Sequence, residues 1–517
     1  MRCLLQLAQR ILVGDPRTLA REAERRAWLA GDRDARQFAA QLAPRPGSDD
    51  VGVGHVTLRD GRRKAVALTR GFLRQSHLAI PCGSTGSGKT TMAVEFLDRV
   101  LDDPGERLLA IDPKGDVSSA LRERYFPARA AGPDGGAFAA RLRYLRAFAG
   151  GQPPPLRLTL PEPGVAPNVQ AMSLGVALAE AAGVELSLPA VHTFAKLARV
   201  AIERGAALTE IVRWIARPEL FARIACNSRD EEIRQFGAHG FQHEHKGVLR
   251  SLKARIEGVL LLPSVRAALE APGCIDFARS LEEHHLLIDL SNPPAGEEAA
   301  VRMLGGPLIG RFTRAILNRR LHADSPHVWL AIDEVQEVLT NGGYEASSLD
   351  RILALSRARR VSLLTINQLS AQLPRRLREA IRANTGAELF FRASEADAKL
   401  LSTVLPVPED AERPSEARRA LIRRIMGLQR REAALWVKTA RVPLGFIRAP
   451  KVDFDELDRR AARLAPETRA RLGEWPAHEV QDRRLAPVAS PPEPVNEPAE
   501  VVPPFPDDPG GDFPGLG

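Results

Sequence analysis

The segment GSTGSGKT at Gly83–Thr90 places glycines, a lysine and a hydroxyl residue at the spacing G-x-x-x-x-G-K-[ST]. Glycines let the backbone wrap closely around an anion and direct successive N–H groups at phosphate oxygens. In this pattern the lysine reaches the β- and γ-phosphates of a nucleotide, and the following hydroxyl is a ligand of Mg²⁺. We therefore predict ATP and Mg²⁺ as cofactors. The predicted nucleotide-binding residues are Gly83, Ser84, Thr85, Gly86, Ser87, Gly88, Lys89, Thr90 and Thr91, with Thr90 also on the metal.

Two adjacent carboxylates, Asp333 and Glu334, follow the apolar run Val328–Ile332. This run predicts a central strand, and open α/β sheets bind their ligands at the carboxyl ends of such strands. We predict that Asp333 holds Mg²⁺ through water and that Glu334 takes a proton from the attacking water. An ordinary boundary between a strand and a loop has the same appearance, but the upstream phosphate-binding pattern favours the catalytic interpretation.

Two further polar residues flank the next apolar run, Val361–Ile366. Gln368 follows it, where an amide could contact the γ-phosphate or orient water, or simply cap the strand. Arg357 precedes it in LSRARR, eleven residues before Gln368. In so arginine-rich a chain, a solvated surface group is the alternative interpretation of any single arginine.

The elements that must carry these residues alternate between strands and helices. HLAI at His77–Ile80 predicts a short strand before the glycine-rich loop, and Thr90–Leu101 predicts a helix with its apolar residues mostly on one side. Alternation of this kind indicates an α/β fold with a parallel sheet. The other predicted strands lie in the apolar runs that begin at Arg107, His285, His327, Val361 and Glu388.

The order of predicted elements suggests one nucleotide-binding domain with an insertion. We expect an N-terminal helical and strand segment at 1–70 and an all-α insertion between the two halves of the core. A proline-rich tail ends the chain; it has nine prolines, six acidic residues and no lysine or arginine, so we expect it to be disordered. The tail either solubilises the protein or contacts a protein partner. The remaining expected boundaries are the first half of the core at 71–165, the insertion at 166–281, the second half of the core at 282–450, a helical extension at 451–488 and the tail at 489–517.

The charge favours an anionic partner. The net charge is +9, and removal of the tail's −6 leaves +15 on the preceding residues. A basic protein of this kind favours nucleic acid, although a solvated basic surface is the alternative.

The widely spaced cysteines argue against a disulfide framework, and no run approaches the ~18 apolar residues of a membrane span. We therefore expect a cytoplasmic protein without an integral membrane span. The cysteines are Cys3, Cys82, Cys226 and Cys274.

A histidine cluster in HGFQHEH could suggest a metal site. His239 and His243 would lie on one face of a helix, with His245 beside them. Zinc sites normally need a second pair of ligands, which this spacing does not supply. We interpret the cluster as a polar loop, exposed to solvent or facing DNA.

Five motifs in order resemble the HerA/FtsK superfamily of ring ATPases, and most closely the TraD/TraG/TrwB type of conjugative coupling proteins of type IV secretion. The resemblance covers roughly residues 71–448. It implies a RecA-like core with an inserted all-α domain, a hexameric ring and ATP-driven translocation of DNA, single- or double-stranded. The motifs are GSTGSGKTT at 83–91, DPKGD at 112–116, LAIDEVQ at 330–336, SRARRVSLLTINQLSAQL at 356–373 and IRANTGAELFFRASEADAKLL at 381–401.

The resemblance also implies roles for individual residues. Lys89 with Thr90 forms the Walker A pair, and Asp333 with Glu334 forms the Walker B pair. Gln368 is then the polar sensor, Arg357 the arginine finger that acts on a neighbouring subunit's ATP, and Arg392 a second arginine of the site. The DPKGD loop places Asp112, Lys114 and Asp116 near the nucleotide, without an assigned catalytic step.

The chain departs from the family pattern in three places. Coupling proteins of this type usually carry N-terminal membrane helices, and none is visible here. Pro81 interrupts the strand before the phosphate-binding loop, and RARRV occupies a position where glycine is common.

A related motor that powers protein secretion or pilus assembly is the alternative function. Basic charge and the coupling-type motifs favour DNA.

Overall fold

The computed structural model describes residues 32–148, 155–181, 187–244, 246–338, 351–368, 373–407, 414–475 and 480–481. The predicted tail at 489–517 and His245 lie outside the described residues.

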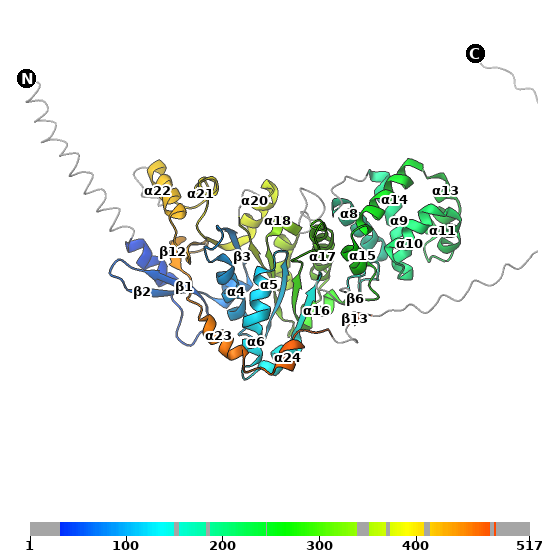
Figure 1. Cartoon of the computed structure of the whole chain (residues 1–517). Helices are drawn as coiled ribbons and strands as arrows, with labels where there is room; N and C mark the ends of the chain where they lie inside the picture. The colour runs from blue at the N-terminus through cyan, green and yellow to red at the C-terminus, as the bar shows by residue number, and fades with distance from the viewer. Residues whose placement is uncertain are drawn as a thin grey trace, which may run out of the picture. The chain divides into compact units, whose positions relative to one another are not determined.

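The central feature is an eleven-stranded sheet with the order β2-β1-β12-β11-β10-β3-β9-β8-β4-β7-β5 (Figure 1). All neighbours from β10 to β5 are parallel, and the strands from β2 to β10 on the other side form antiparallel pairs. The α/β fold with a parallel sheet is therefore confirmed. The strands are β1 (Val51–Thr57), β2 (Arg63–Leu68), β3 (His77–Cys82), β4 (Glu106–Asp112), β5 (Leu142–Arg146), β7 (His285–Asp289), β8 (His327–Asp333), β9 (Val361–Ile366), β10 (Thr385–Phe390), β11 (Glu432–Val437) and β12 (Leu444–Arg448).

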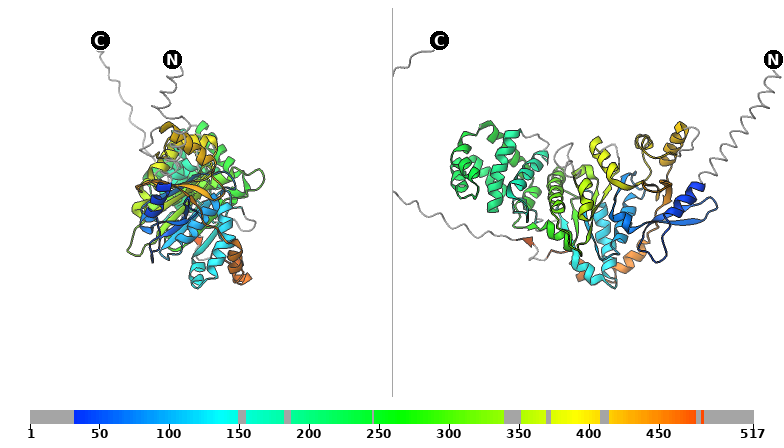
Figure 2. Two further views of the ribbon diagram at one scale, coloured as in Figure 1. Left: turned by 90° about the vertical axis from the view of Figure 1, so that its left-hand side faces the viewer. Right: turned by 180° about the vertical axis from the view of Figure 1, so that it is seen from behind.

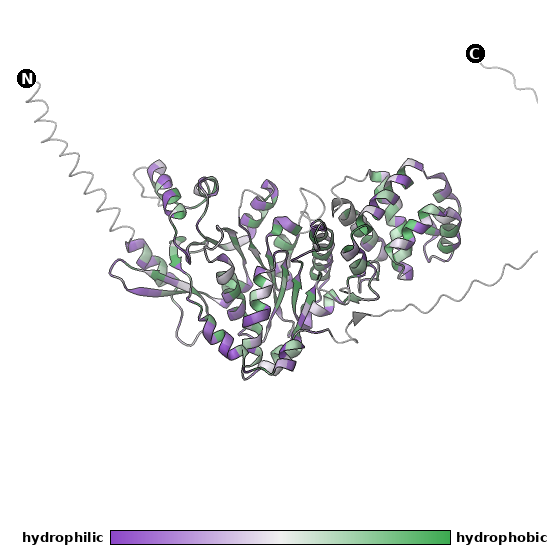
Figure 3. Ribbon diagram, in the orientation of Figure 1, coloured by the Kyte–Doolittle hydropathy of each residue, from purple (hydrophilic) through white to green (hydrophobic). Residues whose placement is uncertain are grey.

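The sheet separates two apolar cores, and the period of two along each strand decides which core a residue enters. On β8, Trp329 and Ala331 join one core, whereas Leu330 and Ile332 join the other. Every residue of β3, β4, β8 and β9 is buried, as expected for parallel strands covered on both faces. Figure 3 shows these strands mainly in the hydrophobic colour, with hydrophilic residues concentrated on the outer helices.

Helices from different parts of the chain cover the two faces (Figures 1 and 2). One core contains apolar residues of the helix that follows the glycine-rich loop and of the helices after β4. The opposite core contains residues of the helices that flank β7, β8 and β10. The first group is α4 (Lys89–Val100), α5 (Asp116–Ala120), the π-helical η1 (Leu121–Tyr125) and α6 (Phe126–Ala130); the second is α16 (Phe277–Glu283), α17 (Ala300–Leu317), α18 (Val335–Val338) and α20 (Arg375–Asn384).

The chain between β5 and β7 is mainly helical. Its buried residues, among them Phe194, Trp214 and Phe221, are continuous with the core on the α17 face. A short strand, β6 (Cys274–Ile275), pairs with β13 (Val480–Gln481) in a separate small sheet. The helices are α8 (Pro167–Ala181), α9 (Leu188–Arg204), α10 (Leu208–Ala216), α11 (Pro218–Ala225), α12 (Glu231–Gln235), η2 (Phe236–Gly240), α13 (Phe241–His243), α14 (Lys246–Leu260) and α15 (Pro263–Leu269).

The remaining elements flank the sheet. A helix over residues 32–41 packs Phe38 against Gly445 of β12. The first hairpin begins at Val51, inside the N-terminal segment of helix and strand expected at 1–70. Within the described residues, we find no helix with the length and apolar character needed to cross a bilayer. The other helices are α3 (Arg70–Arg74), α7 (Gly135–Arg141), η3 (Ser356–Arg359), α21 (Glu395–Ser402), α22 (Pro414–Met426), α23 (Phe454–Ala461) and α24 (Pro466–Ala470).

The backbone accommodates two of the departures from the family pattern, Pro81 and Arg360, by local changes of geometry. β3 continues through Pro81 to Cys82, and the register between β3 and β10 slips around that proline. A proline cannot donate to the ladder, so an irregularity is expected there. Arg360, in the position where glycine is common, has a left-handed φ of 54°. Its guanidinium is held by the carbonyls of His322, Ala323 and Ser325.

Candidate nucleotide-binding site

The glycine-rich loop links the end of β3 to the first residue of α4, Lys89. Gly86 and Gly88 have φ values of 75° and 102°, which side chains rarely adopt. A Cβ on Gly88 would also lie 3.3 Å from the backbone of Arg431. Strand, loop and helix therefore have the arrangement that the motif requires.

Three segments from the second half of the chain fix this loop through its backbone. The Gly83 N–H donates to the Gln368 carbonyl at 3.0 Å, and the Ser84 N–H donates to the Arg392 carbonyl at 2.8 Å. The Arg431 N–H donates to the Ser87 carbonyl at 2.7 Å. The loop is thus held from outside, and inside it the Ser87 N–H donates to the Ser84 carbonyl at 3.1 Å. The other N–H groups of the loop are left for a ligand.

The side chains of the loop fit an anionic ligand. Thr85 is exposed, Thr90 and Thr91 are partly exposed, and Lys89 is buried. The Ser87 hydroxyl is buried without a hydrogen-bond partner in the part of the chain that the structure describes. A buried polar atom of this kind needs a partner, and a phosphate oxygen would supply one.

Asp333 and Glu334 stand at the carboxyl end of β8, separated from β3 by β9 alone. Both side chains are buried, with exposed fractions of 3% and 0%. The Glu334 N–H donates to Asp333 Oδ1 at 3.0 Å, and Glu334 has a left-handed φ of 44°. A non-glycine residue in that conformation costs about 1–2 kcal/mol, and such residues cluster at functional sites.

Four donors surround the carboxylate of Glu334. Oε1 lies 3.0 Å from Lys114 Nζ and 3.5 Å from Lys89 Nζ. Oε2 accepts from Gln336 Nε2 at 2.6 Å and from the Gln368 N–H at 3.1 Å. Burial raises the pKa of Glu334, but the Gln336 hydrogen bond and the two lysines outweigh it, so the pKa lies below its ordinary value. The group is therefore an ionised base.

Asp333 behaves in the opposite way. Burial, and next the nearby carboxylate of Asp112, raise its pKa to about 7, against the opposing charge of Lys89. A cation would stabilise the negative charge of a buried carboxyl that lies beside a second carboxylate. Mg²⁺ is such a cation, because it prefers oxygen ligands. Asp333 and Thr90, which lies in the first turn of α4, have the oxygen ligands that would suit such an ion. The described residues contain no group of three histidine, cysteine or acidic side chains that could hold a metal, and this includes the surroundings of His239 and His243.

The DPKGD loop is folded around Asp112. One carboxylate oxygen of Asp112 accepts from the N–H groups of Lys114 and Gly115, and the other accepts from the Ser118 N–H. Gly115 has a φ of 85°, and a Cβ there would lie 2.5 Å from Ser291 Oγ. This tight turn starts α5 at Asp116 and aims Lys114 at Glu334.

Gln368 and Arg392 both lie beside the loop. The main chain of Gln368 contacts both halves of the site, because its N–H reaches Glu334 and its carbonyl accepts from Gly83. Arg392 is exposed, and its Nε donates to Ser84 Oγ at 3.1 Å. Both predicted residues are therefore brought to the site of their own chain.

Arg357 lies elsewhere. It is exposed on η3 at the amino end of β9, where it donates to the Gln75 carbonyl at 3.4 Å. Gln75 precedes β3, whereas the glycine-rich loop follows β3, so a six-residue strand separates the two. At ~3.3 Å per residue this is ~20 Å, beyond the reach of an arginine side chain. Arg357 does not contribute to the site of its own chain.

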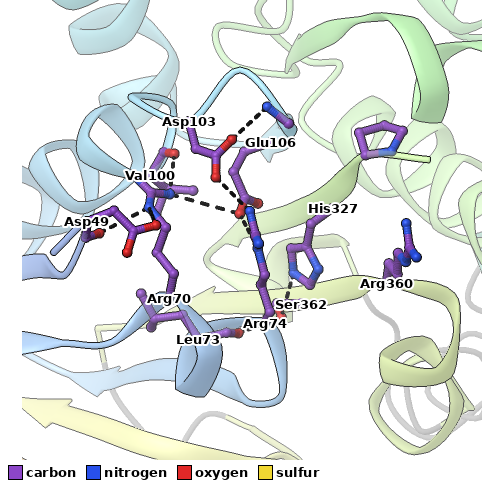
Figure 4. A network of polar contacts seen from close by, with 12 residues as sticks. Asp49, Arg70, Leu73, Arg74, Val100, Asp103, Glu106, His327, Arg360 and Ser362 are labelled. Atoms are coloured by element: carbon purple, nitrogen blue, oxygen red, sulfur yellow. Dashed lines mark hydrogen bonds and ion pairs between the residues drawn. The ribbon is translucent and has the colours of Figure 1, made fainter. Parts of the chain in front are cut away.

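Buried polar groups brace this amino edge of the sheet. Figure 4 shows Glu106 facing Arg74, with Nε to Oε1 at 2.9 Å, and His327 bonded to Ser362 at 3.0 Å. His77 Nε2 donates to the Leu353 carbonyl just before η3, while its Nδ1 accepts from the Leu363 N–H. Strand ends and the start of η3 are therefore tied together.

Sequence reasoning missed three contributors to the site. Gln336 orients Glu334 and in turn accepts from Asn367 Nδ2 at 2.6 Å. Arg431 closes on the glycine-rich loop with a left-handed φ of 69°. Gln336 and Asn367 stand within two of the five motifs, beside or close to the predicted site residues. Arg431 lies outside every motif, and only the folded structure brings it there.

The parallel sheet, the loop and the paired carboxylates together define a RecA-like P-loop fold. No protein-family model and no curated protein sequence matches the chain. Among solved structures, the bacterial conjugative coupling protein TrwBdeltaN70 matches with 14% identity and a TM-score of 0.53, over 80% of this chain and 92% of that one. VirB4 of Thermoanaerobacter pseudethanolicus matches with 15% identity and a TM-score of 0.55, over 80% of this chain and 99% of the VirB4 chain. The chain has the fold of TrwB and VirB4, and the expected structural resemblance is confirmed.

Proposed function

We propose that this protein is an ATPase that acts at subunit interfaces of a ring and translocates DNA. The observation that carries ATP hydrolysis is the meeting of Lys89 and Glu334 at the carboxyl edge of the sheet, 3.5 Å apart. TrwB has been solved in complex with ADP and Mg²⁺ and with the ATP analogue ADPNP, at 15% and 16% identity to this chain. Those complexes support ATP and Mg²⁺ as the cofactors.

The chemistry of each side chain at the site suits it to one of three tasks: binding the phosphates, holding the metal or accepting a proton. The loop N–H groups, the Ser87 hydroxyl and Lys89 would bind the phosphates, and Thr90 with Asp333 would hold Mg²⁺. The ion, when bound, neutralises charge on the phosphates. Glu334 is ionised and buried, so it can orient a water molecule and accept its proton. Gln368 and Gln336 keep that carboxylate in one position.

The placement of Arg357 supports a ring. An arginine finger that cannot reach its own site must act on a neighbour's, and a head-to-tail contact that closes on itself produces a ring. The coupling-protein resemblance suggests six subunits. Arg392, beside its own Ser84, would then act within the same subunit.

The basic charge supports DNA as the substrate of translocation. The residues before the tail carry +15, and contacts to phosphates require such charge. The test is ATP hydrolysis by the purified full chain at increasing concentrations of single- and double-stranded DNA. We expect several-fold stimulation that falls steeply with added salt.

A motor that powers protein secretion or pilus assembly is the second candidate, because the superfamily that the motifs resemble includes such motors. Such a motor should hydrolyse ATP at a rate that is indifferent to DNA. ATPase activity without any response to either form of DNA would therefore exclude translocation of DNA and favour this alternative.

A further inference from the structure

Lys114 is, of the two lysines at the site, the one whose ammonium lies closer to the carboxylate of Glu334. Its Nζ lies 3.0 Å from Oε1, whereas Lys89 Nζ is 3.5 Å from the same oxygen. The other oxygen, Oε2, is already occupied by Gln336 and by the Gln368 N–H. Of the described residues, these two lysines are the cations that contact this fully buried carboxylate.

The two lysines differ in what else they must do. Lys89 belongs to the glycine-rich loop, and phosphates in that loop would attract its ammonium. Its longer contact with Glu334 is therefore the one that a nucleotide would take away. A buried carboxylate left without any cation is unfavourable and would reorient toward a new partner.

Lys114 is anchored independently of the glycine-rich loop. Its own N–H and that of Gly115 donate to Asp112 at the end of β4, and Ser118 holds the other oxygen of Asp112. The tight approach of Gly115 to Ser291 fixes the turn from the other side. Nucleotide binding to the loop at 83–90 therefore leaves the support of Lys114 in place.

We propose that Lys114 is a positioning residue that holds Glu334 Oε1 in its catalytic orientation once Lys89 has engaged the nucleotide phosphates. This inference rests on the proposed ATPase function. It assigns to the DPKGD loop a task that requires no contact with the nucleotide. Its effect should appear in turnover and not in nucleotide affinity, because Glu334 acts in the chemical step.

The test compares full-length Lys114→Met, Lys114→Gln and Lys114→Arg with the wild type. We expect both neutral variants to lower kcat by about 10²-fold, the loss typical of a misplaced catalytic group. The dissociation constant of a non-hydrolysable ATP analogue should stay within about two-fold of the wild type. Lys114→Arg should recover most of the rate, because it keeps a cation at that position. Lys399→Met is the matched control, since Lys399 pairs with Glu395 on the exposed side of α21.

A double variant decides whether Lys114 acts through Glu334. The readout is the residual single-turnover rate of the Glu334→Gln variant, and Lys114→Met should not lower that residual rate further, because the group that Lys114 positions is already gone. An equal loss in that background, or a parallel loss of analogue affinity, would overturn the positioning role. So would a neutral variant with wild-type kcat. An inactive wild-type chain would instead overturn the proposed function, and the positioning role with it.

Discussion

Arg357 and Lys89 stand at opposite ends of a pair of parallel strands. Arg357 precedes β9, and Lys89 follows β3, which is hydrogen-bonded to β9 from Leu78 to Ile80. The strands are buried on both faces and cannot fold back to join the two residues. A reaction that needs both must therefore combine residues of two subunits.

The first prediction follows from this separation. Arg357→Ala and Lys89→Ala should each be inactive alone, because a finger contributes roughly 10³–10⁵ in rate and the lysine binds the phosphates. Mixed rings should regain activity at about a quarter of their interfaces, where an intact Lys89 meets an intact Arg357. The measurement is ATPase activity after subunit exchange, with exchange followed by fluorescence. Exchange without recovered activity would point to Arg359, Arg360 or Arg392 instead.

A second prediction separates binding from chemistry. Lys89→Ala should weaken nucleotide binding and abolish hydrolysis, whereas Glu334→Gln should bind ATP and fail to turn it over. The reason is that binding depends on the loop and the metal, while the carboxylate of Glu334 acts in the transition state. Nucleotide titration and single-turnover kinetics measure the two effects. Hydrolysis at a near wild-type rate in Glu334→Gln would show that another residue is the base.

The third prediction concerns Gly88. An alanine there must adopt a φ of 102° and place its Cβ 3.3 Å from the Arg431 backbone, so the loop has to open. We expect Gly88→Ala to lower nucleotide affinity by at least about 100-fold through loss of the loop's geometry. Gly258→Ala in α14 is the control, because its Cβ meets nothing within 4 Å and alanine favours a helix. Equal affinities in both variants would contradict the structure of the loop.

A fourth prediction concerns acid stability. Burial, against the opposing Leu353 hydrogen bond, lowers the pKa of His77 to about 4. A histidine in the unfolded chain has a pKa near 6.5. Between about pH 6.5 and pH 4 the unfolded chain therefore binds a proton at His77 that the folded chain does not bind, and the folded state loses stability as the pH falls. By pH 5 this costs about 2 kcal/mol in the free energy of unfolding.

Denaturant unfolding at about pH 7.5 and pH 5 provides the measurement, with wild type compared with His77→Gln. The variant loses the buried hydrogen bonds at both pH values, so its stability should be lower throughout. The loss of stability between the two pH values should nevertheless be smaller in the variant. An identical loss in both proteins would mean that His77 is protonated in the folded state.

Sequence reasoning reached those features of the site that depend on local spacing. The loop at 83–90 and the pair Asp333–Glu334 each lie within a few residues and keep their geometry in any fold that has a strand before them. The parallel sheet also followed, because its strands are short apolar runs that alternate with helices. The position of β9 between β3 and β8 brings Gln368 to both halves of the site, as its place after an apolar run suggests.

Contacts between distant segments could not be predicted in the same way. Nothing in the sequence near Arg431 indicates that its N–H meets Ser87, more than three hundred residues earlier. The pairing of Lys114 with Glu334 depends equally on β4 lying next to β8. Pro81 suggests an interruption of β3, yet the slipped register with β10 allows the strand to continue. In each case neighbouring strands, and not neighbouring residues, determine the geometry.

The left-handed backbone of Glu334 implies a trade-off between stability and activity at the position of the proposed base. Glycine would relax this φ of 44° and recover the roughly 1–2 kcal/mol that an ordinary side chain loses there. It would also remove a buried charge whose four donors must all be in place. A search for more stable variants would therefore tend to select against the proposed base, and a stabilised chain should be assayed for ATP turnover before it is taken as an improved protein.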